Sequence, residues 1–249
     1  MKPRKHLIIP DLQDRPDVTK EHMSWIGQYI VDQKPDVVVQ IGDWGDFNSL
    51  STYDRKTKRA EGKRLLADIE SLRESVNTLM APIKKAKKKL PELHVVLGNH
   101  EDRVDRYINE NPELDGVLPT PSSIYLDAGW DVHEFLTPLV VDGVCYVHYM
   151  ANPLSGRPYG GSALGILRNV GHSFVMGHRQ VLDVATRTLP VDGKQQWGIV
   201  AGACYPHDED YKGVQGNRHW RGLIVAHEVC DGDFDPMFVS LDYLKRTYG

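Results

Sequence analysis

The sequence predicts a single α/β domain spanning residues 1–249. In the first half, short apolar runs rich in Val and Ile alternate with helical stretches, which is typical of parallel strands joined by helices. From residue 130 onward the segments are short and strand-like, with turn residues between them. No linker, internal repeat or low-complexity tract separates the halves, and 249 residues are enough for one substantial core.

The first half is predicted to contain three buried parallel strands, at residues 6–10, 36–41 and 93–97. The helix between the first two must end before Pro35, because the residue that precedes a proline disfavours helical conformation. The helix between the second and third is amphipathic, since apolar residues from Leu65 to Ile83 recur at steps of three and four. One face of this long helix is expected to pack on the sheet.

The second half is predicted to be mainly β. Asp142-Gly143 and Asp192-Gly193 are hairpin-turn signals, and the first lies between two Val-rich runs. Apolar residues 164–167 predict one short helix after a glycine-rich loop. The predicted strands are residues 131–135, 139–141, 144–149, 174–176, 181–189, 197–201 and 222–229.

Composition excludes several classes of protein. The chain is 41% hydrophobic and 26% charged, which is ordinary for a folded globular protein. No apolar run approaches the roughly 18 residues of a membrane helix, and no secretory leader is visible. The three cysteines have no CxxC spacing, so we expect reduced thiols and a cytoplasmic protein.

Charge is unevenly distributed. The net charge of -4 gives no overall attraction to nucleic acid. Basic residues nevertheless gather in residues 55–64 and 84–89. We expect the second run to be a solvated helix end that complements the helix dipole, with contact to a phosphate backbone as the alternative. The first run could lead a nucleic acid toward a site near Asp43.

Polar side chains follow five predicted strands, at the carboxyl ends where an α/β sheet opens to ligands. Taken singly, Asp43 could be a turn residue, Asn99 could tolerate a left-handed backbone, and His148 could be a core histidine. Together, carboxylate, amide and imidazole donors at one rim predict a divalent metal site without thiolates. The residues are Asp11, Gln13, Asp43, Asn99, His100, His148, His178 and Gln180.

These residues resemble the motifs of the calcineurin-like metallophosphoesterase superfamily in their order and in their places after strands. The series is Asp11-x-Gln13, Gly42-Asp43, Gly98-Asn99-His100-Glu101, His148 and Gly177-His178-x-Gln180. The stretches 40–51 and 98–103 look most like phage-encoded members, which would place the protein in the cytoplasm of the host cell.

The resemblance implies an αββα sandwich, with two mixed β-sheets flanked by helices. It implies a hydrolase of phosphate mono- or diesters in which two divalent metal ions activate a hydroxide. By the same resemblance, Asp43 would bridge both ions, Asn99, His148 and His178 would complete one site, and Asp11 would anchor the other. His100 would be the catalytic imidazole that protonates the leaving oxygen or stabilises phosphoryl charge.

Two positions depart from the family pattern, because Gln13 and Gln180 stand where members commonly have His. Amide oxygens are harder and weaker donors than imidazoles. We therefore expect Mn²⁺ or Mg²⁺ on the Asp11 side, rather than tightly held zinc or iron. Alternatively, both glutamines hold water instead of metal.

Further residues are weaker candidates. Arg103 is expected to reach a substrate phosphate, with an exposed helix arginine as the alternative. Asp46 is a candidate hydrogen-bond partner of a metal ligand, or else it only caps the following segment. Arg179 is expected to point away from the metals, and residues 217–222 are candidates for the substrate rim.

Three functions therefore compete. A small phosphate ester suits the acidic chain, whereas a DNA or RNA nuclease suits the two basic runs and the phage-like resemblance. A non-catalytic binding module is the third reading, and the presence of His100 argues against it. The sequence leaves the oligomeric state open.

Overall fold

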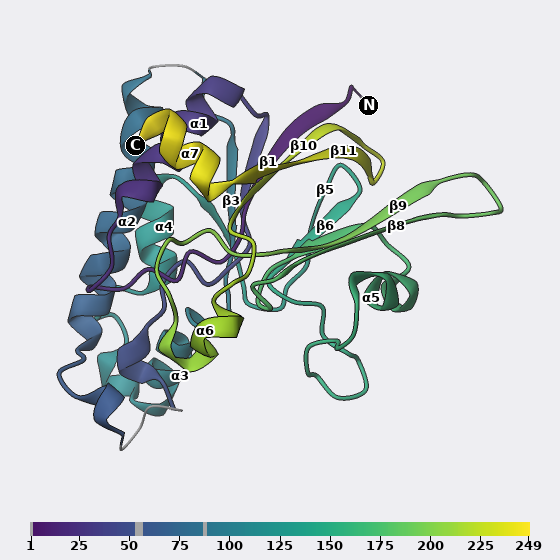
Figure 1. Ribbon diagram of the computed structural model, residues 1–249. Coiled ribbons are helices and arrows are strands. Elements are labelled where there is room, and N and C mark those ends of the chain that lie inside the picture. Colours follow the sequence, from purple (N-terminus) through teal and green to yellow (C-terminus); the bar gives the residue numbers. More distant parts are fainter. Residues whose placement is uncertain (1, 53–56, 87–88) are drawn as a thin grey trace.

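The computed structural model describes residues 2–52, 57–86 and 89–249, and its layers follow the order helices, sheet, sheet, helix (Figure 1). This confirms the predicted α/β fold with two mixed sheets flanked by helices. The longer helices cover one side of the sandwich, and α5 (Ala163–Val170) covers the other.

The first sheet has six strands in the order β11-β10-β1-β2-β3-β4. Its centre is parallel, with β1 beside β2, β2 beside β3 and β3 beside β4. Two antiparallel strands, β10 and β11, extend it beyond β1. Its strands are β1 (Arg4–Ile9), β2 (Val37–Gln40), β3 (Glu92–Val96), β4 (Asp131–His133), β10 (Gly222–Cys230) and β11 (Asp233–Ser240).

The second sheet has five strands in the order β5-β6-β7-β9-β8. The predicted turns at Asp142-Gly143 and Asp192-Gly193 close the antiparallel pairs β5–β6 and β8–β9. Between them, β6, β7 and β9 run parallel. The strands are β5 (Leu139–Val141), β6 (Val144–Val147), β7 (Phe174–Met176), β8 (Leu182–Thr188) and β9 (Gln195–Ala201).

Side chains alternate between the two faces of each strand, and this alternation divides the apolar core into layers. In β1, Ile8 packs between the two sheets, whereas Leu7 and Ile9 pack under the helices. Successive side chains of a strand point to opposite faces, so a continuous apolar run can supply both layers. The outer layer on the first sheet is formed by α1 (Glu21–Gln33), α2 (Leu65–Lys85), α4 (Pro121–Ala128) and α7 (Leu241–Tyr248).

Most predicted elements are confirmed. The first helix ends at Gln33, before Pro35, and the long amphipathic helix is α2. Two strands predicted in the mainly β half, β4 and β10, belong instead to the first sheet, because they pair with β3 and β1. The sequence analysis missed α4, β11 and α7, although Thr120 caps α4 and Ser240 caps α7 in the way such residues begin helices.

Lys84 and Lys85, which begin the second basic run, lie at the far end of the sheet from the carboxyl ends of the parallel strands. Lys84 and Lys85 form the last turn of α2, just before β3 begins at Glu92. This agrees with the predicted helix-end placement. Residues 87–88 of that run, and residues 55–56 of the first run, lie outside the described residues.

The remaining helices are short. They are α3 (Asp102–Glu110), α6 (Gly213–Gly216) and the 3₁₀ turns at Asn48–Leu50, Lys58–Ala60, Pro112–Leu114 and Asp210–Lys212. In the ranges that the structure describes, no helix has the length and apolarity needed to cross a membrane.

A buried polar contact joins the two sheets at the β5–β6 turn. Asp142 Oδ2 accepts hydrogen bonds from Arg4 Nε at 2.6 Å and from His6 Nε2 at 2.9 Å. His6 Nδ1 lies 2.6 Å from the Tyr146 hydroxyl, which then acts as its donor. Burial lowers the pKa of His6, and the pKa of Asp142 is lowered because hydrogen bonds from Arg4 and His6 outweigh its partial burial.

We predict that Asp142→Asn lowers the free energy of unfolding at pH 7 by about 1–3 kcal/mol, the range for hydrogen bonds to a charged group. A carboxylate whose pKa is lowered on folding stabilises the protein above its unfolded pKa and loses that effect as the pH falls through the folded pKa. The difference between wild type and variant should therefore shrink below the ordinary pKa of 3.8.

Urea unfolding at pH 7 and at successively lower pH measures this difference. Asp192→Asn is the matched control, since Asp192 also lies in a hairpin turn but accepts only from the backbone N–H of Lys194. A difference for Asp142→Asn that stays constant down to the lowest pH would show that its charge does not stabilise the fold.

Candidate metal centre

The predicted ligands meet at one edge of the sandwich, and both sheets contribute to it. Asp11 and Gln13 follow β1, Asp43 follows β2 and Asn99 follows β3, while His148 follows β6 and both His178 and Gln180 follow β7. The carboxyl ends of parallel strands share one edge, which explains why residues far apart in sequence converge there. The structure therefore brings together residues that the sequence places after five separate strands.

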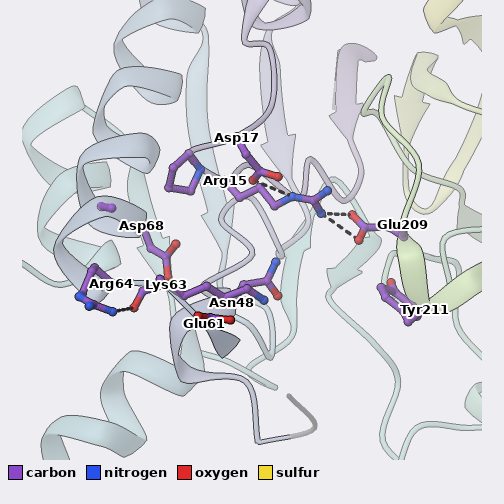
Figure 2. Close-up of a pocket in the computed structure, with 12 residues that line it drawn as sticks. Arg15, Asp17, Asn48, Glu61, Lys63, Arg64, Asp68, Glu209 and Tyr211 are labelled. Carbon is purple, nitrogen blue, oxygen red and sulfur yellow. Dashed lines mark hydrogen bonds and ion pairs between the residues drawn. The ribbon is translucent and has the colours of Figure 1, made fainter. Parts of the chain in front are cut away.

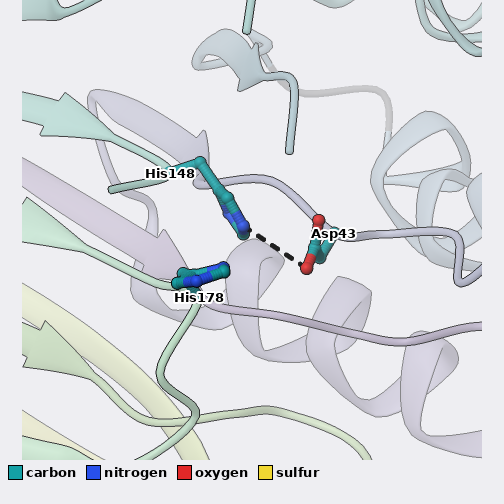
Figure 3. A group of neighbouring side chains, drawn as sticks. All are labelled: Asp43, His148 and His178. Atoms are coloured by element: carbon teal, nitrogen blue, oxygen red, sulfur yellow. Dashed lines mark ion pairs between the residues drawn. The ribbon is translucent and has the colours of Figure 1, made fainter. Parts of the chain in front are cut away.

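Four donor atoms surround one point in this centre. Asn99 Oδ1 lies 2.9 Å from His148 Nε2 and 2.8 Å from His178 Nδ1. Asp43 Oδ2 lies 3.3 Å from His148 Nε2. Figure 3 shows Asp43, His148 and His178, whose ligand atoms all lie within 4.8 Å of one another. Two imidazoles, one carboxylate and one amide oxygen suit a divalent first-row metal.

The imidazoles are held in fixed orientations. His148 Nδ1 donates to the Ile41 carbonyl at 3.0 Å, so its Nε2 faces the centre. Burial opposes the charge on His148, but the Asp43 carboxylate outweighs burial and raises the His148 pKa to about 9. Burial, with the nearby His148, lowers the pKa of His178 to about 4. Without a metal the centre holds a proton beside Asp43, and a divalent ion there would replace that proton.

The Asp11 side of the centre contains unpartnered oxygens. Asp11 Oδ1 accepts from the backbone N–H of His178 at 3.0 Å, whereas Asp11 Oδ2 is buried with no hydrogen-bond partner among the described residues. Gln13 Nε2 donates to Asp43 Oδ2 at 3.2 Å, and Gln13 Oε1 is likewise buried and unpartnered in the described chain. Burial raises the pKa of Asp11 to about 6, and the Asp43 carboxylate adds to that rise. Unpartnered buried oxygens beside a second carboxylate fit a cation.

Gln180 differs from Gln13 because its oxygen already has a donor. The Tyr205 hydroxyl donates to Gln180 Oε1 at 2.8 Å, and Lys212 Nζ donates to the Tyr205 hydroxyl at 2.9 Å. These contacts bring a lysine charge to the Asp11 side, although burial lowers the pKa of Lys212. The sequence analysis missed both Tyr205 and Lys212, which lie outside every motif that it used.

His100 lies beside the centre, where it contacts Asp43 and Asp46. Its backbone N–H donates to Asp43 Oδ1 at 3.0 Å, its Nε2 lies 3.7 Å from Asp43 Oδ2, and its Nδ1 lies 2.9 Å from Asp46 Oδ1. Burial opposes the charged imidazole, but Asp43 and Asp46 outweigh burial and raise the pKa of His100. Asp46 therefore contacts His100, which is not among the predicted ligands, and its role as the partner of a metal ligand stays a prediction.

The weaker candidates have structural contacts. Arg103 donates to the backbone carbonyl of Asp46 at 2.8 Å, so it supports the segment that contacts His100. Arg179 donates to the Gly161 carbonyl, in a loop outside the cluster of ligands. Asn217, in the predicted rim, exchanges hydrogen bonds with the backbone of Glu209. Substrate contact by Arg103 stays a prediction.

Glu101 is the main residue whose function the sequence analysis missed. Its carboxylate is buried and accepts from four backbone N–H groups at 2.8–3.1 Å and from the Tyr125 hydroxyl at 3.1 Å. The four N–H groups belong to residues 43–45 and 98, in the loops after β2 and β3. The Glu in Gly98-Asn99-His100-Glu101 was the available signal, but its partners are not visible in the sequence.

The backbone around the ligands is unusual in two ways. Gln13, Asp43, His178 and Gln180 all have left-handed backbones, with φ between 46° and 66°. Such residues cost on the order of 1–3 kcal/mol each and cluster at functional sites. In addition, a Cβ on Gly98 would stand 2.1 Å from Asp43 Oδ1, so only glycine leaves room for that carboxylate.

Residues 5–215 match the calcineurin-like phosphoesterase family, and the chain belongs to that family. It is therefore a metal-dependent hydrolase of phosphate esters. No curated protein sequence matches the chain.

Thirty-seven chains of solved structures are similar to it. One is a dimetal phosphatase from Danio rerio, with 10% identity, a TM-score of 0.45 and coverage of 97% of this chain and 100% of that chain. Another is a conserved protein from Streptococcus pneumoniae TIGR4, described as a predicted phosphoesterase, with 10% identity, a TM-score of 0.39 and coverage of 97% and 92%. The family assignment rests on the family match alone.

We predict that Gly98→Ala weakens divalent-metal binding by at least about tenfold, the size of effect seen when groups that orient metal ligands are changed. The added methyl group displaces the Asp43 carboxylate, which lies 2.1 Å from the Cβ position. Calorimetric titration with Mn²⁺ measures the change. Gly160→Ala is the matched control, because a Cβ there meets nothing within 4 Å. Equal Mn²⁺ affinity in both variants would show that Asp43 is not a ligand.

Proposed function

We propose that this chain hydrolyses phosphate mono- or diesters at a centre of two divalent ions, with Mn²⁺ as the expected ion. The observation that carries the proposal is the convergence of Asp43, Asn99, His148 and His178 beside the unpartnered Asp11 carboxylate oxygen. When bound, the two ions supply an activated water for attack on phosphorus and neutralise the phosphoryl oxygens.

The donor set divides into two unequal halves around Asp43. One ion would be held by Asp43, Asn99, His148 and His178. The other would be held by Asp11 and Asp43, with Gln13 Oε1 as its amide donor and Gln180 at its outer edge. Carboxylate and amide oxygens predominate on the second side, which favours Mn²⁺ or Mg²⁺ over zinc.

His100 is the residue of this chain placed to move a proton. Its Nδ1 lies 2.9 Å from Asp46 Oδ1 as an ion-pair contact, and its Nε2 lies 3.7 Å from Asp43 Oδ2, so a proton on Nε2 is on the Asp43 side of the ring. Asp43 and Asp46 both favour the protonated imidazole. In the proposed reaction, Nε2 gives its proton to the oxygen that leaves phosphorus, so a poor leaving group departs as a neutral alcohol.

The same geometry argues against a non-catalytic binding module. A purely structural histidine at position 100 would gain nothing from two carboxylates that keep it charged in a buried place. Arg103 donates to the backbone carbonyl of Asp46, so Asp43, Asp46 and Arg103 together support one proton donor. Such support for a donor is characteristic of catalysis.

Metal removal tests the proposed centre. We predict that EDTA abolishes hydrolysis of bis(p-nitrophenyl) phosphate and that Mn²⁺ restores it. Dialysed protein should retain fewer than two ions per chain by mass spectrometry, because the Asp11 side offers amide oxygens in place of imidazoles. Gln13→His combined with Gln180→His should raise the retained metal, since imidazole suits first-row ions better than an amide oxygen.

Gln215→His is the control for that experiment, because it adds an imidazole at an exposed position away from the cluster of ligands. If the double variant retains no more metal than this control, Gln13 and Gln180 do not contact an ion. Full activity in a metal-free preparation would contradict the proposed function as a whole.

His100→Asn tests the proton donor. We predict a metal content near that of wild type and a kcat lower by roughly 10²–10⁴ for alkyl esters, with a smaller loss for nitrophenyl esters that leave without a proton. His172→Asn is the control, since His172 is exposed and, among the described residues, its ring contacts the backbone carbonyl of Ser173 alone. Equal losses along a series of leaving groups would exclude proton donation by His100.

A further inference from the structure

Figure 2 shows the residues that line a cavity of about 450 Å³. Its walls come from four parts of the chain: the loop after β1 with Arg15, the turn that begins at Asn48, the segment that leads into α2 with Lys63 and Arg64, and the loop with Glu209 and Tyr211. The volume lies in the range of small-molecule sites, typically about 300–1,000 Å³.

Two residues that line this cavity contact Asp46, which lies beside the centre. Asn48, which lines the cavity, donates to Asp46 Oδ2, and Arg15 lies 3.6 Å from the same oxygen. The other oxygen of Asp46 lies 2.9 Å from His100 Nδ1. The cavity is therefore on the His100 side of the centre, where the leaving oxygen is protonated if the proposed function holds.

Tyr211 connects the opposite wall to the centre. Burial raises the pKa of Tyr211 and the Gln180 side chain acts in the opposite direction, so the Tyr211 hydroxyl lies near Gln180. Its residue surface is 62% exposed, and it lines the cavity. An exposed aromatic face at a cavity wall is a platform on which a flat polar group, such as a nucleobase, can stack.

The charges of the cavity do not suit a polyanion. Among its described lining residues, three are basic and four are acidic: Arg15, Lys63 and Arg64 against Asp17, Glu61, Asp68 and Glu209. The Arg15 guanidinium is already bound by both oxygens of Glu209, each at 2.9 Å, and by Asp17 at 3.0 Å. A second phosphate in this cavity would meet carboxylates and an already paired guanidinium.

The lysines of the other basic run are too distant to change this balance. Lys84 and Lys85 lie in the last turn of the 21-residue helix whose first turn borders the cavity. At a rise of about 1.5 Å per residue, that places them roughly 25–30 Å away.

We propose that this cavity is the leaving-group pocket, and that the substrate is a small phosphate ester whose alcohol is an uncharged polar group of about nucleoside size. The Arg15–Glu209 pair rejects alcohols that carry further phosphates, and the Tyr211 ring stacks on the flat face of the alcohol. This inference rests on the proposed function, because it assigns the cavity to the alcohol that His100 protonates.

Two substrates that differ by one phosphate test the pocket. Adenosine 5′-monophosphate and adenosine 3′,5′-bisphosphate present the same 5′-ester, but the second has a charged alcohol. With Mn²⁺ present and products separated by chromatography, we expect kcat/KM for the 5′-ester to be at least about tenfold higher for the monophosphate. Equal use of the bisphosphate, or faster cleavage of a single-stranded DNA oligonucleotide, would overturn the inference.

Variants of the two walls test the mechanism of selection. Glu209→Gln keeps a hydrogen-bond acceptor for Arg15 but removes the negative charge, so discrimination against the bisphosphate should fall several-fold. Tyr211→Leu removes the ring, whereas the matched Tyr211→Phe keeps it, so only the leucine variant should raise KM for the monophosphate by about five- to tenfold. Equal KM values in these two variants would exclude stacking.

Different results would contradict the proposed function and the assignment of the pocket. If neither nucleotide nor bis(p-nitrophenyl) phosphate is hydrolysed with Mn²⁺ present, the proposed function is wrong. If bis(p-nitrophenyl) phosphate is hydrolysed but the monophosphate and bisphosphate are used equally well, the function stands and the pocket assignment is wrong.

Discussion

The buried carboxylate of Glu101 is the contact on which the rest of the centre depends. It gathers backbone N–H groups from the loops after β2 and β3, which would otherwise be buried without partners. Burial raises the pKa of Glu101, and the nearby Asp43 adds to that rise, yet the four amides compensate for its charge. Because one of these amides is that of Asp43, the same carboxylate fixes the backbone from which the Asp43 side chain projects.

Fixing Asp43 in this way has a consequence for its neighbours. The loops approach so closely that only glycine fits at position 98, and Asp43 itself takes a left-handed backbone. Strain of this kind persists only where surrounding contacts over-determine the conformation. Here these contacts are the Glu101 carboxylate, the amide of His100 on Asp43 Oδ1 and the Gln13 amide on Asp43 Oδ2.

Most of the fold could be predicted because apolar runs and turn residues report local structure. The elements that were missed depend on tertiary partners. For example, β11 contains Pro236 and begins with two aspartates at positions 233 and 235, so it looks unlike the buried strands. The proline is tolerated because β11 lies at the edge of the sheet, beside β10. The β10–β11 turn at Asp231-Gly232 has the same signal as Asp142-Gly143 and was overlooked.

The candidate site was predictable to a similar extent, and for a topological reason. Side chains after parallel strands must share one edge, so the positions of Asp11, Asp43, Asn99, His148 and His178 follow from the strand assignment. The strand assignment does not predict the contacts made by Glu101, Tyr205 and Lys212. Each depends on a loop that folds back over the edge, and such an approach leaves no periodic trace in the sequence.

The two carboxylates of the centre, Asp43 and Asp11, differ in pKa because of where the histidines lie. Burial acts on both, but His100 and His148 outweigh it at Asp43 and lower the Asp43 pKa, whereas Asp11 keeps a pKa raised to about 6. At neutral pH the ionised form of Asp43, on the side with the imidazoles, is therefore strongly favoured. The ionised form of Asp11, on the side with the glutamines, is favoured only weakly. Lys212, placed through Tyr205 beside Gln180, brings an ammonium group to the side of the centre that has amides in place of imidazoles, and burial lowers its pKa.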